Sequence, residues 1–195
     1  MYNNLSIPMV LYTPTQEVGV SKYTSFGDVN QSKLKALINS SFAEQGKELA
    51  TNYFDTTKPS AVYVAGDFYA AGTIIRDLGR NLGDTVYICK FFVDPSLQGN
   101  GLGRDLLEHI LHDIGIKPEN HDGKSVILRT DVKNIKANKL YNGVFSEEYS
   151  GSSHHVKSTD GKHEWFVHQI GLQGEGLERK IRVVADLPIT MIPVN

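Results

Sequence analysis

Apolar and polar positions alternate or cluster in short runs along much of this chain, which is typical of β-strands bounded by turns. The runs that fit strands are Val18–Ser25, Ala61–Val64, Ala70–Ile75, Thr85–Pro95, Ser125–Val132 and His163–Ile170. Gly66 and Asp67 separate the second run from the third, so these two are expected to form a hairpin.

Between the strand-like runs, apolar residues recur at helical spacing. Leu34, Leu37, Ile38 and Phe42 predict a helix from Gln31, with Asp28 or Asn30 as its N-cap, and a second helical piece is expected over Glu48–Phe54. After Gly103, one apolar stripe predicts a helix that ends at Gly115; it consists of Leu102, Leu106, Leu107, Ile110, Leu111 and Ile114. A short helix over Asn134–Tyr141 follows the fifth strand, and a polar bend is expected from there to about Asp160-Gly161. This order of elements predicts a mixed α/β sheet with helices on both faces.

The two ends of the chain differ from this pattern. Residues 1–17 contain two prolines and are expected to be a lead-in with one edge strand, so the main domain is placed at residues 18–172. Residues 173–195 form a C-terminal extension with strand-like content at Ile181–Val184. We expect this extension to pack back on the domain or to form a homodimer contact.

Composition excludes several classes of function. The chain has 195 residues, a net charge of −2 and a pI near 6.4, so neither nucleic acid nor an anionic membrane is expected as the main partner. Its one cysteine, Cys89, cannot form an intrachain disulfide, and the N-terminus lacks the features of a signal peptide. His109 and His112 lie at i, i+3 without a third ligand in view, so no metal site is expected. His168 alternates within the last strand and is a weak candidate for a base.

The glycine-rich segment Gln98-Gly-Asn-Gly-Leu-Gly103 lies between a strand and a helix. Such a turn exposes backbone N–H groups at a helix N-terminus, and both these groups and the helix dipole favour a phosphate. The segment lacks the Lys-Ser/Thr pair of a nucleotide P-loop, and no second βαβ unit accompanies it. On its own it is also compatible with an ordinary glycine turn.

A second segment, Asn134-Ile-Lys-Ala-Asn-Lys-Leu-Tyr141, follows a strand directly. Its spacing brings Asn134, Ala137 and Tyr141 near one helix face. Tyr141 could protonate a departing thiolate, and the alternative is a half-buried aromatic of the core.

Taken in this order, Val93–Gly103 and Asn134–Tyr141 resemble the GNAT superfamily of N-acetyltransferases. The resemblance implies a mixed, mostly antiparallel sheet flanked by helices, acetyl-CoA as co-substrate without a metal, and direct transfer of the acetyl group. It assigns to acetyl-CoA the residues Phe91, Phe92, Val93, Gln98, Gly99, Asn100, Gly101, Leu102, Gly103 and Arg104. It places Asn134 near the pantetheine arm and makes Tyr141 the general acid toward the thiolate, both as catalytic residues.

A closer resemblance, over roughly residues 18–172, is to the acetyltransferase domain of N-acetylglutamate synthase. It rests on segments such as Tyr87-Ile-Cys-Lys-Phe-Phe-Val93 and Trp165-Phe166. It implies that Lys90 and Arg129 bind the carboxylates of L-glutamate. Both are cations within apolar strand patterns, where an unpaired charge is costly; the alternatives are an internal ion pair and a snorkelling side chain. Cys89 and Asp131 depart from the family pattern, which usually has Asp and often a second Arg there.

The resemblance therefore implies an enzyme that acetylates the α-amine of L-glutamate in arginine biosynthesis. The alternatives are a GNAT that acetylates another small amine or a protein N-terminus, and a non-catalytic regulatory domain attached to an amino-acid kinase. In this family an amino-acid-kinase domain usually precedes the acetyltransferase domain, so such a domain is an expected partner. The expected location is soluble and intracellular: the mitochondrial matrix for a domain of a eukaryotic synthase, and the cytoplasm otherwise.

Overall fold

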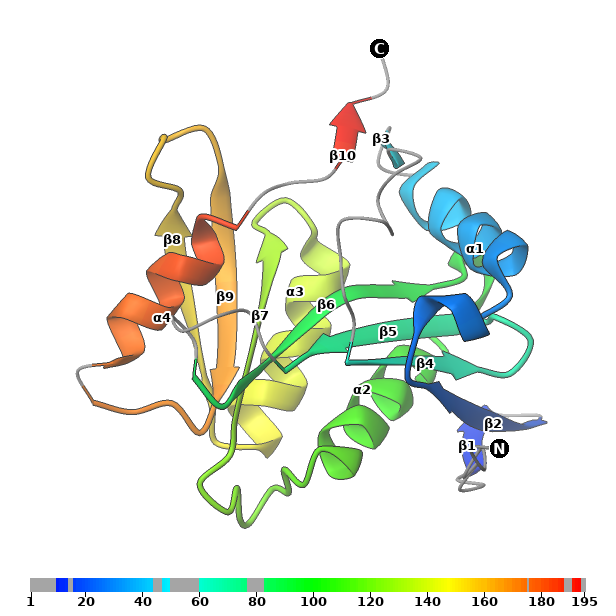
Figure 1. Ribbon diagram of the computed structural model, residues 1–195, viewed down its shortest axis with the longest axis horizontal. Coiled ribbons are helices and arrows are strands. Elements are labelled where there is room, and N and C mark those ends of the chain that lie inside the picture. The colour runs from blue at the N-terminus through cyan, green and yellow to red at the C-terminus, as the bar shows by residue number, and fades with distance from the viewer. Residues whose placement is uncertain are drawn as a thin grey trace. The chain divides into compact units, whose positions relative to one another are not determined.

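The computed structural model describes residues 10–13, 16–43, 47–49, 60–76, 83–174, 176–187 and 191–193 (Figure 1). Its main sheet has eight strands in the order β1-β2-β4-β5-β6-β7-β9-β8. These strands are β1 (Val10–Thr13), β2 (Gln16–Tyr23), β4 (Ala61–Ala65), β5 (Ala70–Ile75), β6 (Thr85–Val93), β7 (Ser125–Asp131), β8 (Ser152–Lys157) and β9 (Glu164–Ile170). A separate pair joins β3 (Lys47–Leu49) to β10 (Met191–Pro193).

The α-helices are α1 (Gln31–Ala43), α2 (Leu102–Asp113), α3 (Ile135–Tyr141) and α4 (Gly176–Ala185). Short 3-10 turns, η1 (Phe26–Asp28) and η2 (Pro95–Leu97), precede α1 and α2, and a π-helix, η3 (Asn142–Glu148), continues α3. Among the strand pairs whose register is described, β6–β7 is parallel and the others are antiparallel. The predicted mixed, mostly antiparallel sheet is therefore confirmed.

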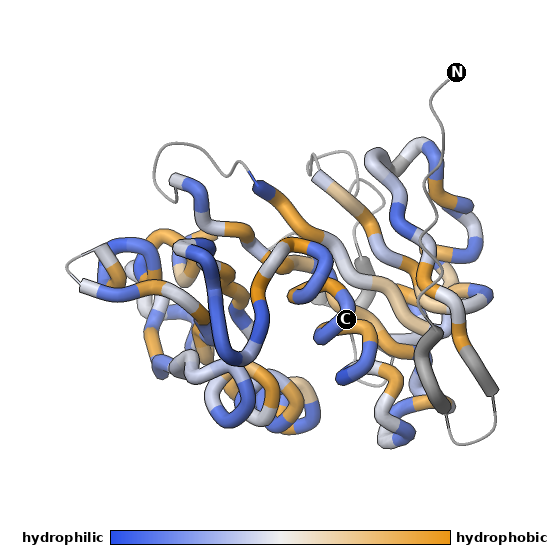
Figure 2. The backbone as a smooth tube through the Cα atoms, turned by 90° about the horizontal axis from the view of Figure 1, so that it is seen from below, coloured by the Kyte–Doolittle hydropathy of each residue, from blue (hydrophilic) through white to orange (hydrophobic). Residues whose placement is uncertain are grey.

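The chain divides into two units, and β6 contributes to both. The first unit comprises Met1–Ile74, Lys90–Ile110 and Ile189–Asn195; the second comprises Ile75–Cys89 and Leu111–Pro188. Figure 2 shows apolar residues along the strands and in alternation with polar ones on the helices. Each unit buries its own apolar positions.

In the first unit, the strand period of two sends alternate residues to different helices. Val62 and Val64 of β4 pack against α1 in one buried cluster. The other members of this cluster are Val29, Leu34, Leu37, Ile38, Ala71 and Phe92. Between them, Tyr63 faces the opposite way and meets the ring of His109 on α2 edge-on, with 6.1 Å between ring centroids. Gly72 allows α2 to approach β5 closely, because a Cβ there would lie 2.6 Å from Ile110 Cδ1. Helices thus cover both faces of this part of the sheet, as predicted.

In the second unit, β9 pairs in antiparallel fashion with β7 on one side and with β8 on the other. His168 on β9 packs against Tyr141 of α3 and Phe145 of η3. The other face carries Arg129, whose guanidinium reaches carbonyl oxygens at the end of α4. This part of the sheet also has helical segments on both faces.

The strand-like reading of Ile181–Val184 was wrong, because these residues belong to α4. β-branched content suggested a strand, but Ile181, Val184 and Ala185 are the buried residues of α4, and their spacing of three and four is helical. The expectation that this region packs back on the domain is confirmed, since α4 contacts β7, β8 and β9. The predicted dimer contact stays a prediction.

Two other expectations failed. Lys47–Leu49 forms a strand that pairs with β10, where a helix was expected from Glu48; the rest of that expected helix, up to Phe54, lies outside the described residues. A partner so distant in sequence leaves no trace in local spacing. The segment expected to be a polar bend holds η3 and β8.

Neither a membrane helix nor a metal cluster is found in the described part of the chain. No helix there is long and apolar enough to cross a bilayer. No group of three or more metal-ligating side chains occurs there either.

Candidate active site

The predicted phosphate turn lies between β6 and α2 in the first unit. Asp94 caps η2, since its Oδ1 accepts hydrogen bonds from the amide (2.9 Å) and the hydroxyl (2.6 Å) of Ser96. The side chain of Gln98 reaches back to the carbonyl oxygen of Val93 at 3.4 Å. Two segments predicted to hold acetyl-CoA, Phe91–Val93 and Gln98–Arg104, therefore lie together.

The backbone of this turn requires glycine and leaves space beside it. Gly99 and Gly101 both have φ of +86°, a conformation that residues with a Cβ rarely adopt. A Cβ on either would meet no described atom within 4 Å. The amide of Asp105 donates to the carbonyl oxygen of Gly101 at 3.1 Å. The amides of Leu102 and Gly103 come earlier in α2, so they have no acceptor within the helix. The turn therefore fits an anion that approaches its backbone.

Some side chains predicted to bind acetyl-CoA belong instead to the core. Leu102 is 1% exposed, and Phe92 packs in the cluster against α1. Only their backbone atoms can face a ligand. Arg104 lies 3.9 Å from Glu108, one turn later on α2, and half-exposed pairs of this kind are weak. Partial burial raises the pKa of the Asp105 carboxyl, and the charge of Arg104 opposes that rise.

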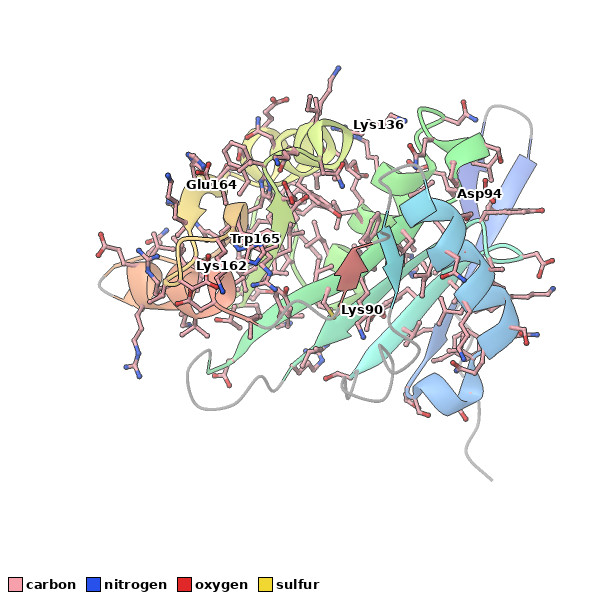
Figure 3. All side chains as sticks on the ribbon, turned by 90° about the horizontal axis from the view of Figure 1, so that it is seen from above. Lys90, Asp94, Lys136, Lys162, Glu164 and Trp165 are labelled. Atoms are coloured by element: carbon pink, nitrogen blue, oxygen red, sulfur yellow. The ribbon has the colours of Figure 1, made fainter. Side chains whose placement is uncertain are left out.

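Lys90 interrupts the regular conformation of β6. Its φ of +56° is unusual for a residue with a side chain and costs about 1–3 kcal/mol. Figure 3 labels Lys90, which lies on β6 and begins the second chain segment of the first unit. The described pairing of β6 with β7 covers only Thr85–Tyr87, ahead of this residue. This irregularity therefore falls immediately before Phe91–Val93.

Tyr141 lies in the second unit as the last residue of α3. It is 6% exposed, and its ring packs against His168 (5.5 Å between centroids) and Phe145 (6.5 Å). Burial, and secondly the neighbouring Tyr87, raise the pKa of its phenol above the ordinary value of about 10. The hydroxyl therefore keeps its proton at neutral pH, as a general acid requires.

Asn134 begins α3. Its Oδ1 accepts a hydrogen bond from the amide of Ala137 at 3.2 Å, which is the N-cap interaction. The structure thus gives Asn134 a structural role, and its catalytic role stays a prediction.

Arg129, on β7, is already bound to protein groups. Its Nη1 donates to the carbonyl oxygens of Val184 (2.7 Å) and Ala185 (3.0 Å), which close the last turn of α4. Its guanidinium lies 4.5 Å from the ring centroid of Trp165, and the indole Nε1 of Trp165 is buried without a hydrogen-bond partner among the described residues. Sequence reasoning foresaw neither the bond to α4 nor the contact with Trp165.

Tyr87 interacts with two of the predicted residues of the second unit, Arg129 and Tyr141, although no motif pointed to it. Burial raises the pKa of Tyr87 to about 12, and a hydrogen bond and the charge of Arg129 oppose that rise. Tyr87 also raises the pKa of Tyr141, so its hydroxyl lies within electrostatic range of that phenol. The one available signal was its tyrosine hydroxyl within an otherwise apolar strand.

Residues 21–115 match the family model of the N-acetyltransferase domain of N-acetylglutamate synthase. This range contains Lys90 and the glycine turn, and it ends before Arg129, Asn134 and Tyr141.

Two curated relatives align with a similar length of chain. An acetylglutamate kinase of Xanthomonas campestris is 39% identical over 87 residues, which are 44% of this chain and 19% of that protein. The mitochondrial N-acetylglutamate synthase of Mus musculus is 35% identical over 88 residues, 44% of this chain and 16% of that protein. The match therefore spans less than a fifth of either relative.

Solved structures extend the likeness to most of the chain. The diaminobutyrate acetyltransferase of Paenibacillus lautus, solved with L-2,4-diaminobutyric acid and coenzyme A, has a TM-score of 0.53 and 15% sequence identity, and the alignment covers 80% of this chain and 98% of that one. Such low identity supports the fold alone. The fold and the family match together confirm the resemblance to the GNAT N-acetyltransferases and, within them, to the acetyltransferase domain of N-acetylglutamate synthase.

Proposed function

We propose that this chain is an acetyl-CoA-dependent N-acetyltransferase and that its acceptor is the α-amine of L-glutamate. The observation that carries the proposal is the glycine turn of Gln98–Gly103, open beside its backbone and placed inside the region that matches the synthase family model. A scaffold needs neither this turn nor a buried, protonated Tyr141.

The donor half of the reaction belongs to the first unit. The pyrophosphate of acetyl-CoA would accept hydrogen bonds from the turn and the first amides of α2, an arrangement that also uses the helix dipole, worth about 0.3–2 kcal/mol. Gly99, Asn100 and Gly101 would take part through the backbone, and Arg104 through its charge. The thioester would lie along Phe91–Val93.

The chemical step is a direct acyl transfer. The neutral amine attacks the thioester carbonyl, a C–N bond forms, and the C–S bond of acetyl-CoA breaks. Tyr141 donates its phenolic proton to the leaving thiolate, an effect of order 10²–10⁴ in rate. The proton that the amine loses passes to water or a weak base, and Tyr141 is then reprotonated.

The acceptor half rests on the two cations that the resemblance assigns to glutamate. Lys90 offers a point charge and Arg129 a planar fork for a carboxylate. Because Arg129 already holds α4 through Nη1 and hydrogen-bonds Tyr87, binding of glutamate would compete with these contacts.

A second acceptor class has its own support. The diaminobutyrate enzyme that shares this fold was solved with a small amino acid and coenzyme A, so another small amine is the main competitor of glutamate. The kinase named among the relatives supports an amino-acid-kinase domain as partner of the present one. Homodimer formation through the C-terminal region stays part of the proposal.

The test is release of coenzyme A thiol from acetyl-CoA, measured with glutamate, diaminobutyrate, other amino acids and short peptides. We expect glutamate to give the largest kcat/KM. Release with another amine and none with glutamate would contradict glutamate as the acceptor. It would still agree with an acetyl-CoA-dependent acetyltransferase. Binding of acetyl-CoA without release toward any amine would leave a regulatory domain.

A further inference from the structure

His168 is a buried histidine with both ring nitrogens engaged. It is 1% exposed, and its ring packs against Tyr141, Phe145 and Phe166. Nδ1 lies 2.7 Å from Ser153 Oγ, and Nε2 lies 3.3 Å from Asn138 Oδ1. No substrate can reach a ring so enclosed, so His168 can act only through its neighbours.

Asn138 decides which nitrogen of His168 carries the proton. Its Nδ2 donates to the carbonyl oxygens of Asp131 (2.9 Å) and Val132 (3.3 Å) at the end of β7. Its Oδ1 therefore faces His168, and since an amide oxygen only accepts, Nε2 of His168 is the donor. In the neutral ring, Nδ1 then accepts from the hydroxyl of Ser153. Burial, and secondly the charge of His154, lower the pKa of His168 to about 4 and keep the ring neutral.

Ser153 connects this ring to the π-helix. Its one hydroxyl proton goes to Nδ1 of His168, so Ser153 Oγ accepts from the hydroxyl of Ser146 on η3 at 3.2 Å. The connected groups therefore hold the chain three residues before Tyr141, at Asn138, and five residues after it, at Ser146. The ring of His168 supports the tyrosine ring between these two points.

We propose that His168, Asn138 and Ser153 form a positioning network that fixes the Tyr141 hydroxyl for proton donation. The proposal rests on the proposed role of Tyr141 as general acid. His168 is buried and Asn138 and Ser153 are partly buried, and a network whose members are hydrogen-bonded in this way is rigid. Rigidity matters here because a proton donor displaced by about 1 Å can lose a factor of order 10² in rate.

The test is a double-mutant cycle between His168→Phe and Tyr141→Phe. Phenylalanine keeps a ring but removes both hydrogen bonds. We expect His168→Phe to lower kcat by roughly 10- to 100-fold with little change in the KM for acetyl-CoA. In the Tyr141→Phe background the same change should cost nothing more. His155→Phe, on the same sheet but outside the network, is the matched control and should leave kcat unchanged.

A loss that persists undiminished in the Tyr141→Phe background would overturn the proposal, because the network would then serve stability alone. Unchanged kcat in His168→Phe would overturn it as well. Ser153→Ala is the second variant, since it removes one hydroxyl and keeps the histidine. It should show a smaller loss with the same dependence on Tyr141.

A readout without turnover separates this proposal from the proposed function. In protein labelled with ¹³C at the tyrosine ζ carbons, the resonance missing from Tyr141→Phe belongs to Tyr141. We expect that resonance to shift or broaden in His168→Phe and Ser153→Ala and to stay unchanged in His155→Phe. An unchanged resonance in both network variants would contradict the positioning role, even in a protein that acetylates no amine. Absent turnover with a perturbed resonance would instead refute only the proposed function.

Discussion

Tyr141 is the residue on which the chemistry depends most. We expect Tyr141→Phe to lower kcat by about 10²–10⁴-fold with little change in either KM, because the hydroxyl acts on the leaving thiolate rather than on binding. Steady-state kinetics in both substrates check this. Because burial raises its pKa, loss of its proton should not depress kcat below pH 10. A raised KM with unchanged kcat would assign Tyr141 to binding instead.

His168 makes a separate prediction for acid stability. Its folded pKa of about 4 lies below the ordinary value of about 6.5, so the unfolded chain binds the proton more readily. The neutral ring therefore makes its full contribution to the free energy of unfolding above pH 6.5. This contribution is lost as the pH falls toward 4 and amounts to roughly 3 kcal/mol. Urea unfolding at several pH values measures it. In His168→Phe the free energy of unfolding should fall less steeply over this window; an equally steep fall would place the titration elsewhere.

Arg129 has a structural duty besides the one proposed for it. Removing its guanidinium leaves two carbonyl oxygens at the end of α4 without this donor, and each charged hydrogen bond is worth about 1.5–3 kcal/mol. Arg129→Ala should therefore lower the melting temperature and also raise the KM for glutamate. Arg129→Lys keeps the positive charge but not the planar guanidinium. It should therefore restore part of the melting temperature and part of the affinity for glutamate. A loss of stability with unchanged KM would make Arg129 purely structural.

The turn between β6 and α2 can be tested as an element. Gly101→Ala places a methyl group in the open space beside the turn and strains a backbone with φ of +86°. We expect a raised KM for acetyl-CoA with the glutamate KM nearly unchanged. Gly83→Ala is the matched control, because Gly83 also has a positive φ, +57°, and open space but lies outside the proposed site. Equal effects of both changes on the acetyl-CoA KM would show that strain alone is responsible.

The spacing of apolar residues predicted those helices and strands whose form depends on residues close together in the sequence. The apolar stripe from Leu102 to Ile114 and the short apolar runs Ala61–Val64 and Ala70–Ile75 predicted α2, β4 and β5. The sequence did not predict β3, whose partner β10 lies far along the chain, or the helical form of α4, whose β-branched residues favour strands. Nor did it predict η3, a π-helix in which Val144 and Phe145 are buried.

The same limit applies to the candidate site. Motifs found the glycine turn and Tyr141, which have characteristic neighbours in sequence. They missed Tyr87 and the network around His168, because those contacts join residues on different strands and helices. Cross-strand partners follow from sheet register, which one sequence does not reveal.

For the whole molecule, the residues proposed for one reaction come from both units of the chain. Lys90 and the glycine turn belong to the first unit, and Arg129, Asn134 and Tyr141 to the second. Of these proposed residues, the family match covers only Lys90 and the glycine turn. A function assigned from that match alone therefore leaves the acid and one carboxylate ligand untested.

The most direct measurement follows the acetyl group itself. The protein is incubated with acetyl-CoA labelled with ¹³C in the acetyl carbons and with an equimolar mixture of glutamate, diaminobutyrate and a short peptide, and the products are identified by NMR. We expect the labelled acetyl group on the α-nitrogen of glutamate, with one N-acetylglutamate formed for each coenzyme A released. Label on another amine, or coenzyme A released without any acetylated amine, would contradict it.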